Sequence, residues 1–132
     1  MLRIPREIHE AVLEHAREGF PLEVCGILGG RGSEVLSHHR MTNTDQSNEH
    51  FMMDPKEQFA LVKELRAAEQ SMLVIYHSHP ESPARPSQED IRLALTPGVA
   101  HLIVSLMDQE TPVAKAFTIS EGTVAPVEIE LF

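Results

Sequence analysis

The alternation of short apolar runs with amphipathic segments is the feature that most constrains the fold of this chain. Apolar residues at helical spacing mark three segments, and runs rich in β-branched residues mark the strands between them. We predict helices over residues 5–18, 55–68 and 87–96, and strands over residues 24–28, 34–41, 72–76, 101–106, 113–119 and 127–131. Strands interleaved with helices indicate an α/β or α+β domain with helices packed against a mixed sheet. No helix separates the closing strands, so we expect them to be antiparallel neighbours.

Length and composition favour one domain over residues 1–132 and exclude several classes of protein. The chain has 11 Lys and Arg against 20 Asp and Glu, a net charge of −9. Nucleic-acid binding depends on clustered basic side chains, so we expect no nucleic-acid partner. The one cysteine, Cys25, excludes a disulfide framework and a cysteine-based zinc site. We find no signal peptide and no run of about 18 apolar residues, which predicts a cytoplasmic protein without membrane contact.

Two of the eight histidines stand in a pattern that suits a metal ion. His77 and His79 follow the apolar strand at 72–76, and side chains two apart in an extended segment point to the same side. Asp90, in the first turn of the third predicted helix, offers a carboxylate oxygen. Two nitrogens and one oxygen leave one position of a tetrahedral zinc ion open, as in catalytic zinc sites. The His-x-His pair alone carries little information, because about 0.5 such pairs are expected by chance.

Each of these residues also has a purely structural interpretation. Ser87-Gln88-Glu89-Asp90 is a helix-capping pattern in which Ser87 caps the helix and Asp90 occupies its third position. The capping and metal-binding roles are compatible, because a carboxylate has two oxygens. For His77 and His79, the corresponding alternative is a solvated or hydrogen-bonded strand end.

The segment His77-Ser78-His79-Pro80, with Ser87 and Asp90 after it and Glu23-Val24-Cys25-Gly26 before it, resembles the JAMM motif of the MPN-plus metallopeptidases. The likeness spans the chain and is greatest to small stand-alone bacterial and archaeal members. The resemblance implies the MPN/JAMM fold, a curved mixed sheet flanked by helices that is similar to the cytidine deaminase architecture.

The resemblance also implies a role for each residue of the motif. His77, His79 and Asp90 would bind one zinc ion per chain. Glu23 would be the general acid/base for a zinc-activated water, and Ser87 would hydrogen-bond the oxyanion of the tetrahedral intermediate. Only the resemblance selects Glu23 over two other candidate carboxylates, those of Glu34 and Glu49.

The activity implied by the resemblance is hydrolysis of a peptide or isopeptide bond after the C-terminal Gly-Gly of a ubiquitin-like protein. Small prokaryotic members act similarly on ubiquitin-like sulfur carriers or related modifiers. We expect the extended Gly-Gly tail to add alongside a sheet edge near the site, through main-chain hydrogen bonds.

Other functions fit parts of the pattern. Two histidines and a carboxylate also describe the facial triad of iron(II) oxygenases, although that site usually spaces its ligands differently. A cupin would be nearly all strands, and a zinc deaminase would need more than the one cysteine present. The non-enzymatic alternative is an MPN scaffold or interaction module. We would expect such a module to have lost a ligand, and this chain retains all of them.

Overall fold

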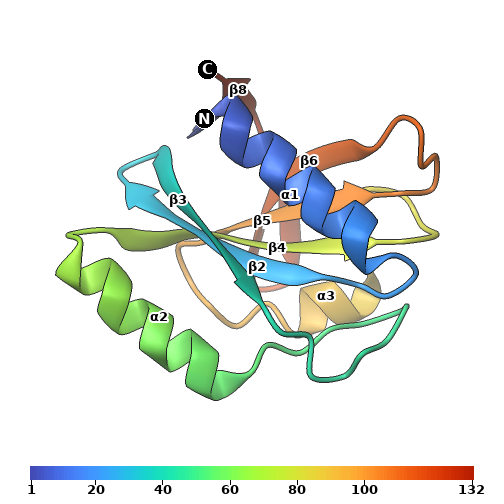
Figure 1. Cartoon of the computed structure of the whole chain (residues 1–132), viewed down its shortest axis with the longest axis horizontal. Helices are drawn as coiled ribbons and strands as arrows, with labels where there is room; N and C mark the ends of the chain where they lie inside the picture. Colours follow the sequence, from blue (N-terminus) through green and yellow to red (C-terminus); the bar gives the residue numbers. More distant parts are fainter.

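The computed structural model describes residues 1–132 as one mixed sheet with three helices (Figure 1). The helices are α1 (Arg6–Gly19), α2 (Pro55–Ala67) and α3 (Gln88–Arg92). The strands are β1 (Leu2–Ile4), β2 (Cys25–Arg31), β3 (Glu34–Met41), β4 (Ser71–His79), β5 (Ala100–Ser105), β6 (Val113–Ser120), β7 (Thr123–Val127) and β8 (Ile129–Leu131). None of the three helices is long and apolar enough to span a membrane.

Strand β4 lies in the interior of the curved sheet, whose order is β7-β6-β5-β4-β2-β3-β1-β8. It pairs antiparallel with β2 on one side and parallel with β5 on the other. Both of its edges are therefore hydrogen-bonded, and on the β5 side the pairing runs as far as His79, which is in register with Ser105. Figure 1 shows α1 lying across one side of the sheet and α2 on another. The α+β class with a mixed sheet and flanking helices is confirmed.

The alternation of side chains along β4 divides the interior into two cores. Val74 and Tyr76 belong to the cluster that includes Val12 of α1. Ile75 belongs to the other cluster, which includes Leu61 of α2. Because successive strand side chains point to opposite faces, the two histidines that follow Ile75 at steps of two lie on the α2 side of the sheet. The alternation of side chains along β4 therefore determines that the two histidines lie on the face of the sheet that packs against α2.

The sequence predicted the start of α2 correctly, and the structure shows why the helix begins there. The side chain of Asp54 accepts a hydrogen bond of 2.9 Å from the backbone N–H of Lys56. Pro55 follows in the first turn, where its missing N–H is not needed. A capping carboxylate of this kind typically stabilises a helix by about 1 kcal/mol.

Several of the predictions are wrong. Strands β1 and β7 were not predicted, and the predicted strand over residues 127–131 is divided between β7 and β8. The third helix ends at Arg92 rather than just before Pro97. Leu93 and Leu95, which suggested a longer helix, are 51% and 81% exposed, so no buried face supports further turns. The closing strands are also not all neighbours, because β8 pairs in parallel with β1 at the opposite edge from β6 and β7. The apolar residues of β1 and β8 match in register across that edge, a contact that local sequence cannot reveal.

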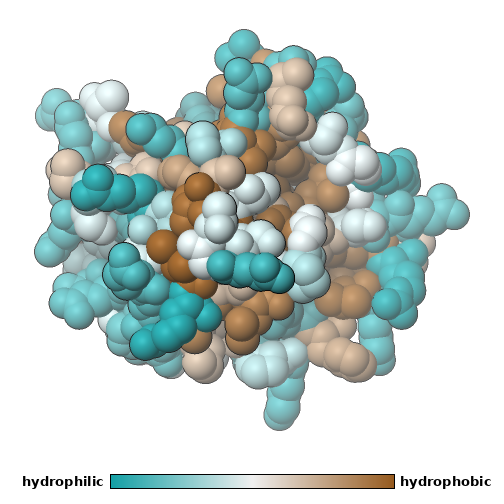
Figure 2. Space-filling view, turned by 180° about the vertical axis from the view of Figure 1, so that it is seen from behind, coloured by the Kyte–Doolittle hydropathy of each residue, from teal (hydrophilic) through white to brown (hydrophobic).

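Apolar surface is not confined to the two cores. Met52, Phe59, Leu93 and Leu95 are all exposed. Seen from behind the view of Figure 1, hydrophobic side chains gather in the middle of the molecule and hydrophilic ones surround them (Figure 2). Exposed apolar patches of this kind often mark binding surfaces.

Candidate metal centre

Three ligand atoms from β4 and α3 converge on one point. His77 Nε2 lies 3.1 Å from His79 Nε2, and Asp90 Oδ2 lies 3.1 Å from each of these nitrogens. His77 and His79 are buried and Asp90 is partly buried, so the group is largely shielded from water. The structure thus brings together the three residues that the sequence proposed as metal ligands.

The protons available at this point cannot satisfy all three contacts. His79 Nδ1 lies 2.9 Å from the Pro83 carbonyl oxygen, to which it must donate, so Nε2 of the neutral ring carries a lone pair. Asp90 Oδ2 accepts a bond of 2.9 Å from the backbone N–H of Ser87. A single proton on His77 Nε2 would form a hydrogen bond with only one of the other two atoms. In the remaining contacts, two hydrogen-bond acceptors would face each other. A cation resolves this conflict.

The size of the triangle and its chemistry fit zinc. Nitrogen and oxygen ligands at about 2.0–2.1 Å from a tetrahedral zinc ion lie roughly 3.3 Å apart, close to the observed 3.1 Å. Imidazole and carboxylate are both ordinary zinc ligands, and three protein ligands leave one position for water or substrate. The residues present therefore fit the metal that the sequence pattern implied.

The capping interpretation of Ser87 and Asp90 is confirmed alongside this convergence. Ser87 Oγ accepts a bond of 3.0 Å from the backbone N–H of Asp90, and Asp90 Oδ2 accepts from the backbone N–H of Ser87. This reciprocal pair fixes the carboxylate on the first turn of α3 and aims Oδ2 at the histidines. The cap uses the Ser87 oxygen as an acceptor, so its hydroxyl proton is available to another group.

Charge in the cluster is set by burial and by these hydrogen bonds. Burial lowers the pKa of His77. Burial also acts to lower the pKa of His79, but hydrogen bonds to Asp90 and to the Pro83 carbonyl raise it overall. For Asp90, burial acts to raise the pKa, and the contacts with the two histidines outweigh it and hold the pKa below the usual range. Asp90 therefore supplies one negative charge to balance a cation.

Glu23 lies just before β2 and is almost completely buried. It is 4% exposed, and its Oε1 has no hydrogen-bond partner. Burial raises the pKa of the carboxyl to about 8. Its backbone N–H donates to the Ser47 carbonyl at 2.8 Å. No hydrogen bond joins its carboxyl group to the three converging ligand atoms. Glu23 is thus a desolvated carboxyl with an unsatisfied oxygen, a state that is common among catalytic acids and bases.

Phe51 is a member of the site that the sequence did not reveal. Its ring stacks on the imidazole of His77, with 4.5 Å between centroids and 24° between planes. The contact fixes the ring plane of His77 and covers it from solvent. No pattern in the sequence around Phe51 indicates this role, because the loop that carries it has no periodicity.

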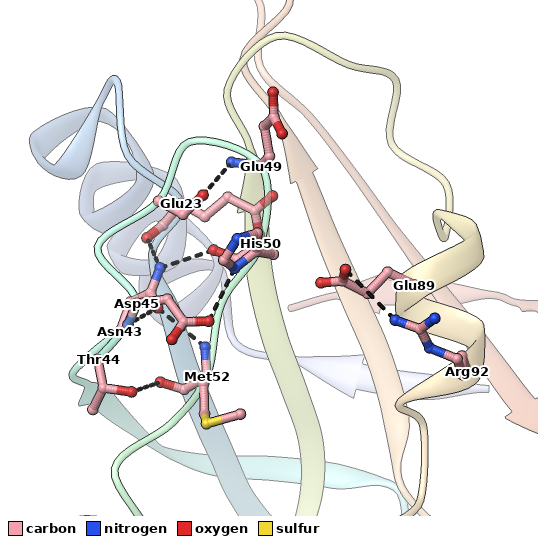
Figure 3. Close-up of polar contacts among 10 residues, drawn as sticks. Glu23, Asn43, Thr44, Asp45, Glu49, His50, Met52, Glu89 and Arg92 are labelled. Carbon is pink, nitrogen blue, oxygen red and sulfur yellow. Dashed lines mark hydrogen bonds and ion pairs between the residues drawn. The ribbon is translucent and has the colours of Figure 1, made fainter.

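A cavity of about 260 Å³ lies beside the converging ligand atoms. Residues 51–53, at the end of the 42–53 loop, form one wall, and α3 with the residues after it forms the other. Figure 3 shows Glu23 and the loop on one side of the strands and Glu89 and Arg92 of α3 on the other. The apolar and aromatic lining of the cavity includes Phe51, Met52, Met53, Ile75, Leu93 and His101. The site therefore opens into a partly apolar groove.

Comparisons with known proteins show which family and which fold this chain matches. The family described as prokaryotic homologs of the JAB domain matches residues 5–120. The sequence is 33% identical over 133 residues to the CysO-cysteine peptidase of Mycobacterium tuberculosis, covering 98% of this chain and 91% of that protein.

Two solved structures share the fold. A protein from Desulfitobacterium hafniense superposes with a TM-score of 0.91 at 45% identity, covering 100% of this chain and 93% of that one. A JAB1/MPN domain protein from Archaeoglobus fulgidus superposes with a TM-score of 0.66 at 24% identity, covering 98% of both chains. The second likeness concerns the fold alone, and it confirms the architecture expected from the sequence.

Proposed function

Because this chain belongs to the family of prokaryotic homologs of the JAB domain, we propose that it is a zinc-dependent peptidase acting on the C-terminal Gly-Gly of a ubiquitin-like carrier protein. The scissile bond is the amide that follows the second glycine. The observation that carries this proposal is the convergence of His77 Nε2, His79 Nε2 and Asp90 Oδ2. The buried carboxyl of Glu23, whose pKa is raised by burial and influenced by the charges of His79 and Asp90, supports it. The identity to a named CysO-cysteine peptidase supports a carrier protein as the substrate.

His77, His79 and Asp90 would hold one zinc ion per chain. Zinc bound there would polarise the scissile carbonyl and lower the pKa of water toward about 7. Asp90 is held in place by the Ser87 backbone, and His79 by the Pro83 carbonyl. Such supporting hydrogen bonds orient ligand atoms, and in other sites their loss typically lowers metal affinity by about 10–100-fold.

Glu23 moves the proton in this proposal. Its carboxyl accepts a proton from the attacking water and returns it to the nitrogen of the leaving amine. Burial suits this role because a desolvated carboxyl readily exists in both the charged and the neutral form near neutral pH. The orphan Oε1 is the atom we assign to the proton transfer.

Ser87 stabilises the oxyanion that forms on the scissile carbonyl. Its hydroxyl proton is not used by the cap, and the cap holds the hydroxyl next to Asp90 at the start of α3. A single donor of this type contributes about 3 kcal/mol to the transition state in comparable hydrolases.

Strand β4 limits where the tail can add to the sheet. At His77 both edges of β4 are paired, with Cys25 of β2 and with Ile103 of β5, so a tail cannot add to β4 there. In this proposal the tail lies in the groove between residues 51–53 and α3, and its addition to a neighbouring sheet edge stays a prediction. Glycines suit this groove because they have no side chain to clash with its walls.

Mass spectrometry tests the proposal directly. Zinc-loaded protein is incubated with a ubiquitin-like carrier whose Gly-Gly terminus is extended by one amino acid, and with the same carrier joined to a lysine side chain. We expect a product that ends at Gly-Gly from at least one of them, and no product when the two glycines are replaced by valines. The variant E23Q should keep its zinc and lose activity by roughly 100-fold or more.

Three outcomes would overturn the proposal. Bound zinc without cleavage of either carrier would favour the interaction-module alternative. Unchanged zinc content in both H77A and D90A would remove the assignment of the metal ligands. Iron in place of zinc, with oxygen consumption, would favour the oxygenase alternative.

A further inference from the structure

Asn43, two residues beyond the end of β3, is the most fully bonded side chain of the loop beside the site (Figure 3). Its Nδ2 donates to the carbonyl oxygen of Glu23 at 3.0 Å and to that of His50 at 3.2 Å. Its Oδ1 accepts from the backbone N–H groups of Asp45 and Met52, both at 3.1 Å. All four hydrogen-bonding positions of the amide are therefore occupied.

These four partners fix the orientation of the amide. If Nδ2 and Oδ1 exchanged places, the oxygen would face two carbonyl oxygens and the nitrogen would face two N–H groups. Three of the partners belong to the 42–53 loop, and the fourth is the backbone of Glu23, twenty residues earlier in the sequence. Asn43 thus joins the loop to the segment that carries the buried carboxyl.

The same loop touches the candidate metal centre at a second point. Phe51, between two residues bonded to Asn43, stacks on the ring of His77. The carbonyl of Ser47, also in the loop, accepts a bond of 2.8 Å from the backbone N–H of Glu23. One amide side chain therefore holds together the elements that place Glu23 and cover His77.

We propose that Asn43 is a positioning residue for catalysis, which fixes the Glu23 carboxyl and the Phe51–His77 stack relative to each other. The inference rests on the proposed function for its catalytic meaning. Proton transfer depends on the position of the carboxyl to a fraction of an ångström, and a displacement of about 1 Å can lower turnover by about 100-fold. Loss of the amide donors releases the Glu23 backbone and allows such a displacement.

The variant N43D isolates the two donor bonds. Aspartate has the same shape, keeps an oxygen for Asp45 and Met52, and places a second oxygen against the carbonyls of Glu23 and His50. The control is T44V, in the same loop, which removes one bond of 3.1 Å from Thr44 Oγ1 to the Met52 carbonyl and leaves Glu23 untouched. N43A, which loses all four bonds, is measured in parallel in case N43D does not melt cooperatively.

The first measurement needs neither zinc nor substrate. Hydrogen exchange of the Glu23 amide reports whether the loop still closes on this segment, because that N–H donates to Ser47. We expect at least tenfold faster exchange in N43D than in the wild type, and a change of less than twofold in T44V. Unchanged exchange in N43D and N43A would overturn the proposed link between the loop and Glu23.

The second measurement separates positioning from binding. With zinc content equal to that of the wild type, N43D should lower kcat by about 10–100-fold, change KM by less than threefold and shift the acidic limb of the kcat/KM pH profile. A rise in KM with unchanged kcat, or an equal loss in T44V, would overturn the proposal. If the wild type itself cleaves no carrier, the proposed function fails. Hydrogen exchange then decides whether Asn43 holds the loop against the Glu23 segment.

Discussion

Replacing Glu23 by glutamine should stabilise the metal-free protein, and the gain should depend on pH. Burial raises the pKa of this carboxyl to about 8 in the folded protein, against an ordinary value of 4.5. The folded state therefore keeps a proton that the unfolded state releases. A carboxyl of this kind does not lower the free energy of unfolding below about pH 4.5. As the pH rises from there toward 8, it lowers the free energy of unfolding by an increasing amount. The amide introduced in E23Q has no proton to lose, so this variant avoids the cost.

The size of the effect follows from the two pKa values. One pKa unit corresponds to about 1.4 kcal/mol. Between pH 5.0 and pH 7.5, the free energy of unfolding of the wild type should fall by about 3 kcal/mol relative to that of E23Q. For a chain of 132 residues, this corresponds to a difference of about 10 °C in Tm. Burial of the Glu23 carboxyl, which the proposed function requires, therefore lowers the stability of the fold at neutral pH.

Thermal unfolding of chelator-treated protein at the two pH values checks this reasoning. The control is E49Q, which removes a charge of the same sign from an exposed side chain in the neighbouring loop. We expect E23Q to exceed the wild type in Tm at pH 7.5 and to approach it at pH 5.0, while E49Q follows the wild type at both. Equal gains for E23Q at the two pH values, or a lower Tm at pH 7.5, would refute the argument. Zinc should reduce the effect, because a nearby positive charge favours the ionised carboxyl.

Two further changes have defined outcomes. S87A should lower Tm by an amount equivalent to about 1 kcal/mol for the lost helix cap and lower kcat about 100-fold while zinc is retained; full activity with the lower Tm would leave Ser87 only its capping role. His15 and His38 both contact the Tyr76 hydroxyl, at 2.6 and 2.7 Å, and burial lowers each pKa to about 4. Because both rings are held neutral in the folded protein, they cost no stability above pH 6.5, and the free energy of unfolding falls as the pH drops toward 4. Between pH 7.5 and 5.0, the double variant H15Q/H38Q should therefore lose about 2 kcal/mol less stability than the wild type. This figure is half the full linkage value, because the two rings are partly exposed. Identical pH dependence of Tm in both proteins would contradict this.

The first two helices and most of the strands could be predicted because their signals are local, whereas strands β1 and β7 were missed. Apolar spacing and the Asp54-Pro55 start located α2, and the apolar run before His77 located β4. The length of α3 and the partner of β8 could not be predicted in the same way. A helix persists only while a packed face supports it, and the neighbour of an edge strand is chosen by contacts with residues far away in the sequence.

The aromatic and amide contacts around the site were also invisible at the level of sequence. The stack of Phe51 on His77 and the four bonds of Asn43 depend on the path of a loop with no periodic pattern. The pairing of His15 and His38 through Tyr76 joins α1, β3 and β4. Four expectations from the sequence stay predictions: a single domain, one zinc ion per chain, a cytoplasmic location and the absence of a nucleic-acid partner.

The sequence by itself determined the ligand chemistry of the candidate centre. With one cysteine in the chain, a zinc ion must be held by nitrogen and oxygen, and the i, i+2 spacing of His77 and His79 on a strand makes their rings converge. Tertiary structure decided the environment of each candidate glutamate. Glu34 is paired with Arg3 at 2.6 Å on the surface and Glu49 is exposed, whereas Glu23 is buried with an oxygen unsatisfied. The family resemblance selects Glu23 among these three residues. Desolvation of its carboxyl depends on atoms contributed by distant segments of the chain, so this physical difference is visible only in the folded protein.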